Sequence, residues 1–160
     1  MYRYVGPNDI RAQALRQPSA TPIRSRHEVV EYVGLLDAAN TPLTFVVSLD
    51  GDLLLAPRES EHVAAAAGDA VLSAGEMTFD ASGRLAAATN QSTGYCPEPT
   101  SWQHVAEALD RIGVDHGDAF TTAFEFRRCP ACYSINLVKE GFFICAVCGH
   151  DLPDRWNLAA

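Results

Sequence analysis

Two Cys-x-x-Cys units close to the C-terminal end constrain the fold of this chain more than any other feature. The sequence reads C-P-A-C from Cys129 to Cys132 and C-A-V-C from Cys145 to Cys148, with twelve residues between the two units. Each unit is typical of a zinc knuckle, a tight turn that directs two thiolates toward one point. The spacing therefore predicts a closed, tetrahedral site in which these four cysteines hold one structural zinc ion.

The interval between the two units has the length of a β-hairpin. We expect strands at 133–138 and 142–145, joined by a turn at 139–141, so that the second knuckle returns to the first. A closed site leaves no open position on the metal, which predicts a structural rather than a catalytic role. Iron in a rubredoxin-like site is the alternative. Zinc is favoured because rubredoxins typically separate their cysteine pairs by a much longer interval.

The 160 residues suffice for one domain and a small appendage. We expect a basic N-terminal segment and linker at 1–24, an α+β core domain at 25–126, and a zinc ribbon with a C-terminal tail at 127–160. The core is long enough to bury its own apolar side chains, whereas a ribbon of about 30 residues needs its metal to fold. The expected fold is α+β: a small, mostly antiparallel sheet with two to four helices, plus the zinc ribbon.

Capping residues and glycine stops predict the helices. They lie at 10–16 (capped by Asn8 or Asp9), from 25 to between 38 and 42 (capping box of Ser25 and Glu28), at 60–67 (closed by Gly68) and at 100–113 (capping box of Thr100 and Gln103, stop at Gly113). In a capping box the hydroxyl accepts a backbone N–H bond and the acid or amide three residues later reaches back. The segment 17–24, QPSATPIR, is predicted to be a linker.

Apolar and β-branched runs predict the strands, at 44–49, 53–55, 70–79 and 85–89. The pair Asp50-Gly51, between the first two runs, is a strong signal for a hairpin turn. Three aromatic residues, Phe120, Phe124 and Phe126, are expected to anchor a last strand against the main core.

The net charge of −8 is spread unevenly along the chain. Residues 1–27 carry five Arg and one acid, residues 28–120 carry fifteen acids and three Arg, and residues 121–160 carry four of each sign. An acidic middle repels phosphate backbones, so nucleic-acid binding by the core is disfavoured. The acidity fits a basic protein partner, or serves solubility alone.

The sequence predicts a cytoplasmic protein without a membrane span. The first residues lack the apolar region of a signal peptide, and no stretch approaches eighteen consecutive apolar residues. Four of the five cysteines lie in the paired units. That pattern in an intracellular chain indicates metal binding rather than disulfides.

The segment NQSTGYCPEPTSW, residues 90–102, interrupts every regular pattern. Two prolines and a glycine fix an irregular backbone there, and such loops frequently carry binding sites. We therefore predict a loop for a ligand or a protein partner. Its candidate contact residues are Asn90, Ser92, Tyr95, Cys96, Glu98 and Trp102.

Cys96 lies in this segment and is the one cysteine without a predicted metal role. It is a candidate nucleophile, because a cysteine acts as one when a base activates its thiol. The candidate partners are His104 or His62 as the base and Glu98 or Glu76 as the group that orients the base. The alternative is a small, buried thiol that packs against Trp102.

Several segments together resemble a group of uncharacterised bacterial proteins, and the likeness covers nearly the whole chain. The resemblance implies a shared architecture and brings no activity with it. The segments are YRYVGPNDI (2–10), SEHVAAAAG (60–68), SAGEMTF (73–79), NQSTGYCPEPTSW (90–102), FEFRRCPAC (124–132), the second Cys-x-x-Cys unit and LPDRWN (152–157).

A weaker likeness covers residues 53–113. The order Ala-Gly-Glu, a short hairpin, a Ser-Gly-His-Tyr-x-Pro motif and a helix is similar to a domain of plant IQ-motif calmodulin-binding proteins and of bacterial toxin-associated domains. Here Tyr95 and Pro97 match the motif, but Gly94 stands where those domains have His. A role that depends on that His is therefore not carried over.

The sequence thus favours a non-enzymatic binding or interaction module with a structural zinc site of four cysteines. We expect a protein partner, with a basic partner suited to the acidic core. The first alternative is a cysteine-dependent enzyme that uses Cys96. The second is nucleic-acid binding through the ribbon, for which Arg127 and Arg128 are the candidate contacts.

Overall fold

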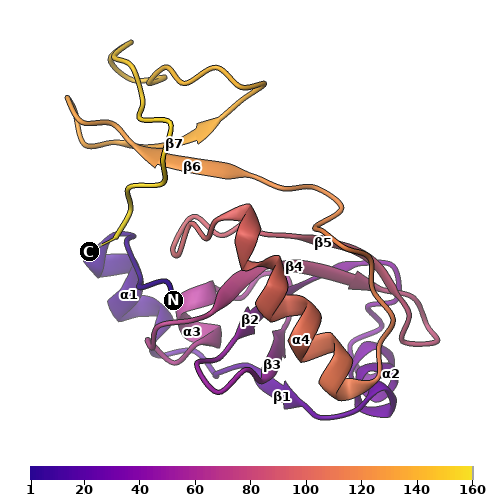
Figure 1. Ribbon diagram of the computed structural model, residues 1–160. Coiled ribbons are helices and arrows are strands. Elements are labelled where there is room, and N and C mark those ends of the chain that lie inside the picture. The colour runs from indigo at the N-terminus through magenta and orange to yellow at the C-terminus, as the bar shows by residue number, and fades with distance from the viewer. Residues whose placement is uncertain (160) are drawn as a thin grey trace.

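A computed structural model describes residues 1–159 and contains a five-stranded antiparallel sheet with helices on both faces (Figure 1). The strand order is β1-β3-β2-β4-β5. The strands are β1 (Thr21–Ile23), β2 (Pro42–Val47), β3 (Leu53–Ala56), β4 (Ser73–Phe79) and β5 (Leu85–Thr89). The expected α+β class is confirmed.

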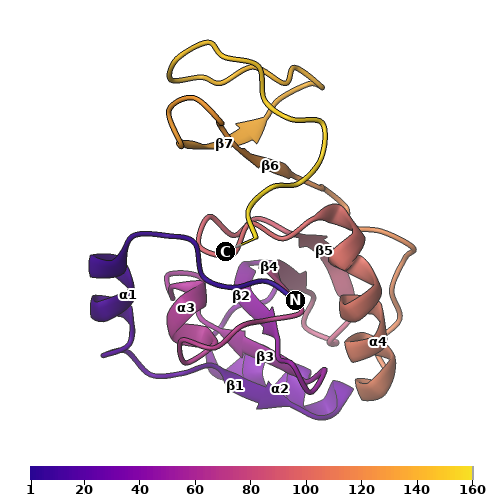
Figure 2. The same ribbon diagram turned by 60° about the vertical axis from the view of Figure 1, so that its left-hand side comes forward.

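Helices cover the two faces of this sheet unequally (Figure 2). They are α1 (Asn8–Ala14), α2 (Arg26–Leu35), α3 (His62–Ala65), the 3₁₀ turn η1 (Pro99–Ser101) and α4 (Trp102–Ile112). Helices α2 and α4 pack on the face that carries Phe45 and Val47, and form the larger core cluster. The shorter α1 and α3 pack with the N-terminal segment on the face that carries Val46. Among residues 1–159, no helix combines the length and apolar character that crossing a bilayer requires.

The strand β2 lies at the centre of the sheet and is buried on both faces. Phe45, Val46 and Val47 are each fully shielded from solvent. Successive side chains of a strand point to opposite faces, so this apolar run supplies both core clusters. The hairpin predicted at Asp50-Gly51 is confirmed, because Val47 pairs with Leu53 across it.

Several local signals act as expected at the helix ends. The hydroxyl of Ser25 accepts the backbone N–H of Glu28 at 3.2 Å. The carboxylate of Glu28 reaches one residue beyond the capping box and accepts the N–H of Arg24 at 2.7 Å. Helix α4 ends at Gly113, whose φ of 73° is the left-handed stop that the sequence predicts.

Two predicted caps are wrong. Helix α1 begins after Pro7, and neither Asn8 nor Asp9 caps it. Thr100 lies inside η1, and Ser101 precedes α4 without a side-chain cap. Proline at the first position of η1 starts a helical turn early, because its fixed φ suits a helix start and its missing N–H needs no partner.

The prediction of a linker at 17–24 is also wrong, because part of this segment is a strand. Residues 21–23 form β1, which pairs with β3 from Thr21–Leu55 to Ile23–Leu53. Ile23 is buried in the larger core cluster. The free edge of β3 accepts this short segment although its composition resembles a linker, because pairing satisfies backbone groups that the edge leaves exposed.

The C-terminal part forms a separate two-stranded sheet at one end of the molecule (Figure 1). Its strands are β6 (Glu125–Arg128) and β7 (Ile135–Val138), which pair with each other. The expected last strand against the main core is therefore wrong, and of its three aromatic residues only Phe126 lies in a strand.

The predicted partner strand at 142–145 is wrong as well. That segment makes only isolated bridges, Lys139 to Phe142 and Ile144 to Asp151. The first knuckle, Cys129–Cys132, forms the turn between β6 and β7. The strand before this knuckle therefore pairs with the strand after it, whereas the sequence predicted pairing between two strands that both follow it.

Candidate metal centre

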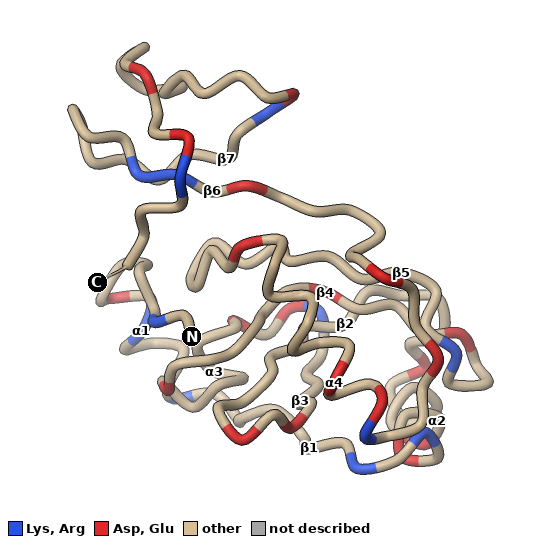
Figure 3. Tube along the Cα trace, in the orientation of Figure 1, with Lys and Arg blue, Asp and Glu red and all other residues tan. Residues whose placement is uncertain are grey.

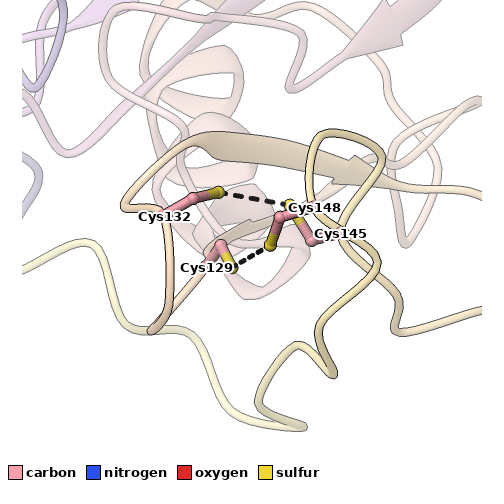
Figure 4. Close-up of side chains that lie close together, drawn as sticks. All are labelled: Cys129, Cys132, Cys145 and Cys148. Carbon is pink, nitrogen blue, oxygen red and sulfur yellow. Dashed lines mark hydrogen bonds between the residues drawn. The ribbon is translucent and has the colours of Figure 1, made fainter.

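The four paired cysteines lie close together, as their spacing predicts (Figure 4). All four sulfurs lie within 4.8 Å of one another. The Cys129 and Cys148 sulfurs are 3.6 Å apart, as are those of Cys132 and Cys145. Zinc–sulfur bonds of about 2.3 Å in a tetrahedron place the sulfurs about 3.8 Å apart. The cluster therefore has the dimensions of a four-thiolate metal site.

Both knuckles close with the same backbone device. The N–H of Tyr133 donates to the carbonyl of Cys129 at 3.0 Å, and the N–H of Gly149 donates to the carbonyl of Cys145 at 2.9 Å. Tyr133 and Gly149 have φ values of 62° and 73°, in the left-handed region. Each turn thereby folds its two thiols toward the same side. Tyr133 adopts this conformation against the preference of an L-residue.

Polar groups point at the sulfur of Cys145. The Ser134 hydroxyl lies 3.3 Å from it, the Val147 N–H donates to it at 3.4 Å, and the Asn136 amide donates to it at 3.5 Å. The Ser134 contact contributes most to lowering the pKa of the Cys145 thiol, to about 5. Contacts of this kind stabilise the thiolate that a metal requires.

The thiol of Cys148 shifts in the opposite direction, its pKa rising to about 12. A backbone contact at His150 lowers this pKa, but desolvation and the contacts with Cys129, Cys132 and Cys145 outweigh it. Four thiols this close cannot all ionise unless a cation joins them. The donor set therefore fits a divalent metal that binds thiolates.

Asn136 is a residue of the centre that sequence reasoning missed. It is buried, its amide nitrogen donates to the Ser134 carbonyl at 3.1 Å, and its amide oxygen accepts the N–H of Ala146 at 2.9 Å. These bonds tie the turn after the first knuckle to the second knuckle. An Asn between Ile135 and Leu137 in a short strand was the available signal, since a polar residue there faces inward only when it has partners.

Most of the candidate contact residues of the loop at 90–102 are buried, and the binding loop itself stays a prediction. The side chains of Asn90, Ser92, Tyr95, Cys96 and Trp102 are buried, and Glu98 is only partly exposed. The Asn90 amide donates to the carbonyls of Pro97 and Phe124, both at 2.8 Å, and accepts the N–H of Phe124 at 2.7 Å. The loop is irregular because its polar groups bind neighbouring backbone.

The thiol of Cys96 has the environment of a buried structural group. It is fully shielded and contacts the carbonyl of Thr93 at 3.3 Å. Burial raises its pKa to about 12, the opposite of what a nucleophile needs. The alternative prediction was right about burial and wrong about the neighbour. Cys96 packs with Phe126 and Leu158, while Trp102 packs in the larger core.

The candidate partners of Cys96 have other contacts. The His62 ring nitrogen bonds to the Gly75 carbonyl at 2.9 Å, and burial lowers the pKa of this imidazole. His104 lies on α4, 3.8 Å from the carboxylate of Glu107. Glu76 follows Gly75 on β4. Within residues 1–159, no hydrogen bond joins the Cys96 thiol to either histidine.

Arg127 is also committed within the fold. It is 7% exposed, and its guanidinium donates to the carbonyls of Pro153 at 3.1 Å and Asp154 at 2.8 Å. It also pairs with Glu125 at 3.1 Å and lies over the ring of Phe143. The sequence made Arg127 a candidate contact for nucleic acid, but in the fold this side chain holds the C-terminal tail in place.

The chain was compared with protein-family models, curated proteins and solved structures, and none of them matches it. The four cysteine sulfurs are therefore the observation from which function is argued. Their geometry fits a metal-binding site of four cysteines.

Proposed function

We propose that this protein is a zinc-stabilised interaction module that docks a protein partner through its ribbon. The observation that carries the proposal is the exposure of apolar side chains around the metal centre. Of eleven exposed large apolar residues, five lie within the fifteen residues 133–147. They are Tyr133 at 70%, Leu137 at 36%, Phe142 at 68%, Ile144 at 54% and Val147 at 72%.

The metal centre accounts for how the ribbon tolerates this exposure. A small domain normally folds by burying its large apolar residues, whereas a metal supplies that stabilisation directly. The apolar side chains of the ribbon are then free to contact another molecule. Val147 lies inside the second knuckle and Tyr133 directly follows the first, so the metal also fixes their positions. Gathered exposed apolar side chains are typical of protein–protein contacts.

Charge indicates the chemistry of the partner. Acidic residues are spread over the core, whereas residues 121–160, which include the ribbon and tail, carry four charges of each sign (Figure 3). An apolar contact on the ribbon beside an acidic core suits a partner with an apolar patch bordered by basic residues. Nucleic acid fits less well, because it offers no apolar patch to the ribbon and Arg127 is engaged within the fold.

Zinc is the metal of the proposal, with one ion per chain. Four thiolates and a closed tetrahedral geometry suit zinc, and the short interval between the knuckles favours it over iron. The thiols must stay reduced to bind it, which suits a cytoplasmic location. Elemental analysis of the purified protein should find about one zinc per chain and no stoichiometric iron.

Site-specific photo-crosslinking in the native cells tests the docking surface. Benzoylphenylalanine replaces Phe142 or Val147 in the ribbon, and Leu35 on α2 in a control that is 83% exposed. We expect one discrete protein adduct from the two ribbon positions and none from the control. Adding Cys148→Ser to the position-142 probe should remove the adduct, since the ribbon then loses its metal. Equal adducts from all three positions, or none from the ribbon, would contradict the proposal.

A further inference from the structure

The C-terminal residues 151–158, here named the strap, connect the ribbon to the core. They leave the second knuckle, run along the ribbon and end against the core near the N-terminal segment (Figure 2). The strap has no helix or named strand of its own. Its position is therefore set by contacts with the two regions that it joins.

The ribbon holds the first part of the strap. The N–H of Leu152 donates to the carbonyl of Phe143 at 2.8 Å, and Leu152 packs against the metal-site residues Cys129 and Cys145. The Arg127 guanidinium binds the strap carbonyls of Pro153 and Asp154. Every one of these contacts depends on a folded ribbon.

The strap ends against Cys96, Phe126 and Tyr2, here named the socket. The indole N–H of Trp156 donates to the carbonyl of Cys96 at 2.8 Å, and the indole packs edge-on against Tyr2 at 5.4 Å. Leu158 is 1% exposed and packs against Cys96 and Phe126. Leu158 and Trp156 of the strap thereby cover Cys96 together with Phe126, Val5, Phe124 and Ile135.

A third set of bonds joins the strap to the base of the ribbon. The side chain of Asn157 accepts the N–H of Arg128 and donates to its carbonyl, both at 2.8 Å. These bonds close a loop that runs from 128 to 157 and contains the whole metal site. When the ribbon is folded its own contacts hold the two ends together, but an unfolded ribbon leaves a long flexible loop whose closure costs entropy.

The metal site itself is open on one side. Cys129 and Cys145 are buried, whereas Cys132 and Cys148 are exposed. Exposed thiolates are the ones that a competing chelator reaches first. Two of the four candidate ligands are therefore accessible to a chelator from solution.

We infer that metal binding at the four cysteines latches the strap onto the core, so that loss of the metal releases the strap and uncovers the socket around Cys96. The inference rests on the proposed function, because the same metal builds the docking face of the ribbon. With metal bound, the ribbon face is formed and the socket is closed. Without it, the face is lost and the socket opens, so the protein reports the availability of zinc.

Two readouts follow the strap directly. The chain has two tryptophans, and Trp102→Phe leaves Trp156 as the only indole. Its emission shifts to longer wavelength when water reaches it. The reaction of Cys96 with N-ethylmaleimide, quantified on its own peptide by mass spectrometry, reports the socket. The thiol is fully shielded and burial raises its pKa, so we expect it to react slowly while the strap is in place.

The experiment removes zinc from this variant with a chelator and then restores it. We expect Cys96 labelling to rise at least tenfold, with a red shift of Trp156, while β2 and β4 keep their amide protection. Added zinc should reverse both changes. In a Trp156→Ala variant, zinc should stay at one per chain while Cys96 is already labelled rapidly, and chelation should add little. Leu35→Ala, at an 83% exposed position on α2, is the control and should behave as the parent does.

Either of two results overturns the inference: zinc leaves while Cys96 stays protected, or Cys96 becomes labelled only when the core also loses amide protection. The proposed function fails separately. A strap that responds to zinc without any photo-adduct from the ribbon refutes docking alone, and a photo-adduct with an unresponsive strap refutes the latch alone. A purified protein without bound metal refutes both.

Discussion

The core and the ribbon are both built on antiparallel strands, yet they are stabilised by different means. Nineteen buried apolar residues form the larger cluster of the core, on one face of its sheet. The cluster of the ribbon has three buried members, Cys129, Cys145 and Leu152, and two of them are metal ligands. The core thus gains its stability from removing apolar surface from water, whereas the ribbon has the four thiols with which, as we propose, a metal stabilises it.

This difference explains where exposed apolar side chains are tolerated. In the core, large apolar residues are buried, and their burial stabilises the fold. In the ribbon, Phe142 and Val147 are left on the surface, which fits the proposal that a metal supplies the stability there. The comparison predicts that damage to one region leaves the other largely intact, apart from the contacts made through the strap.

Loss of a metal ligand should have the largest effect and should be confined to the ribbon. Cys145→Ser removes a thiolate from the centre, and structural zinc contributes about 10–16 kcal/mol of binding free energy in small zinc domains. We expect loss of zinc by elemental analysis and loss of amide protection at 127–150, with β2 and β4 still protected. Cys96→Ser is the control and should retain one zinc. Full zinc content in Cys145→Ser would show that the cluster is not the metal site.

A cavity in the core should have the next largest effect, in the other region. Phe45→Ala removes a fully buried ring from β2 and should lower the free energy of unfolding by about 3–5 kcal/mol. Urea unfolding of the core measures this loss, and zinc content should not change. Leu35→Ala, at an 83% exposed position, should change stability by less than about 0.5 kcal/mol. A matching loss of zinc in Phe45→Ala would mean that the two regions fold as one unit.

Two buried asparagines offer a matched pair of smaller changes. Asn136→Ala removes bonds between the knuckles and should weaken zinc binding about 10- to 100-fold, as outer-shell changes typically do. Asn90→Ala removes three bonds of the 90–102 loop and should lower core stability by about 1–3 kcal/mol. Competition with a zinc indicator and urea unfolding measure the two effects. If both variants weaken zinc binding, or both lower core stability, the two regions are not stabilised independently.

The smallest expected effect is a pH dependence of the core. Burial lowers the pKa of His62 below its ordinary value of 6.5, so below pH 6.5 the unfolded chain binds more protons than the folded one. The contribution of His62 is therefore constant above that pH and falls as the pH decreases toward the folded pKa. Subtracting the unfolding free energies of His62→Gln from those of the parent isolates this slope. The subtraction also cancels His116, whose pKa is raised by its contacts with Gly117 and Asp110. A difference that is flat from pH 7 to pH 5 would contradict the assignment.

Local signals in the sequence predicted local structure well. The paired cysteines, the cap at Ser25, the stop at Gly113 and the hairpin between β2 and β3 all depend on residues within a few positions of one another. Such features are encoded by side chains that act on their own backbone. The failed cap at Thr100 shows the limit, because Pro99 had already started the helical turn.

Features that depend on distant partners escaped the sequence. Three features require knowledge of which edge or surface is free: the pairing of β1 with β3, the pairing of β7 with β6, and the burial of Asn90, Tyr95 and Cys96. Arg127 illustrates the point: beside its near neighbours Glu125 and Phe126, it binds the carbonyls of Pro153 and Asp154, more than twenty residues away in the strap. Buried polar residues of this kind are stabilised by contacts that only the folded chain supplies.

The sequence by itself determined that four cysteines meet at one metal-sized site, because two tight knuckles and a short interval leave the thiols few other arrangements. It also determined the α+β class, through apolar periodicity and turn residues. Only the tertiary structure decided that the strap returns from the ribbon to Trp156 and closes over Cys96. That outcome rests on complementary surfaces from three separate segments, and no short stretch of sequence contains all three.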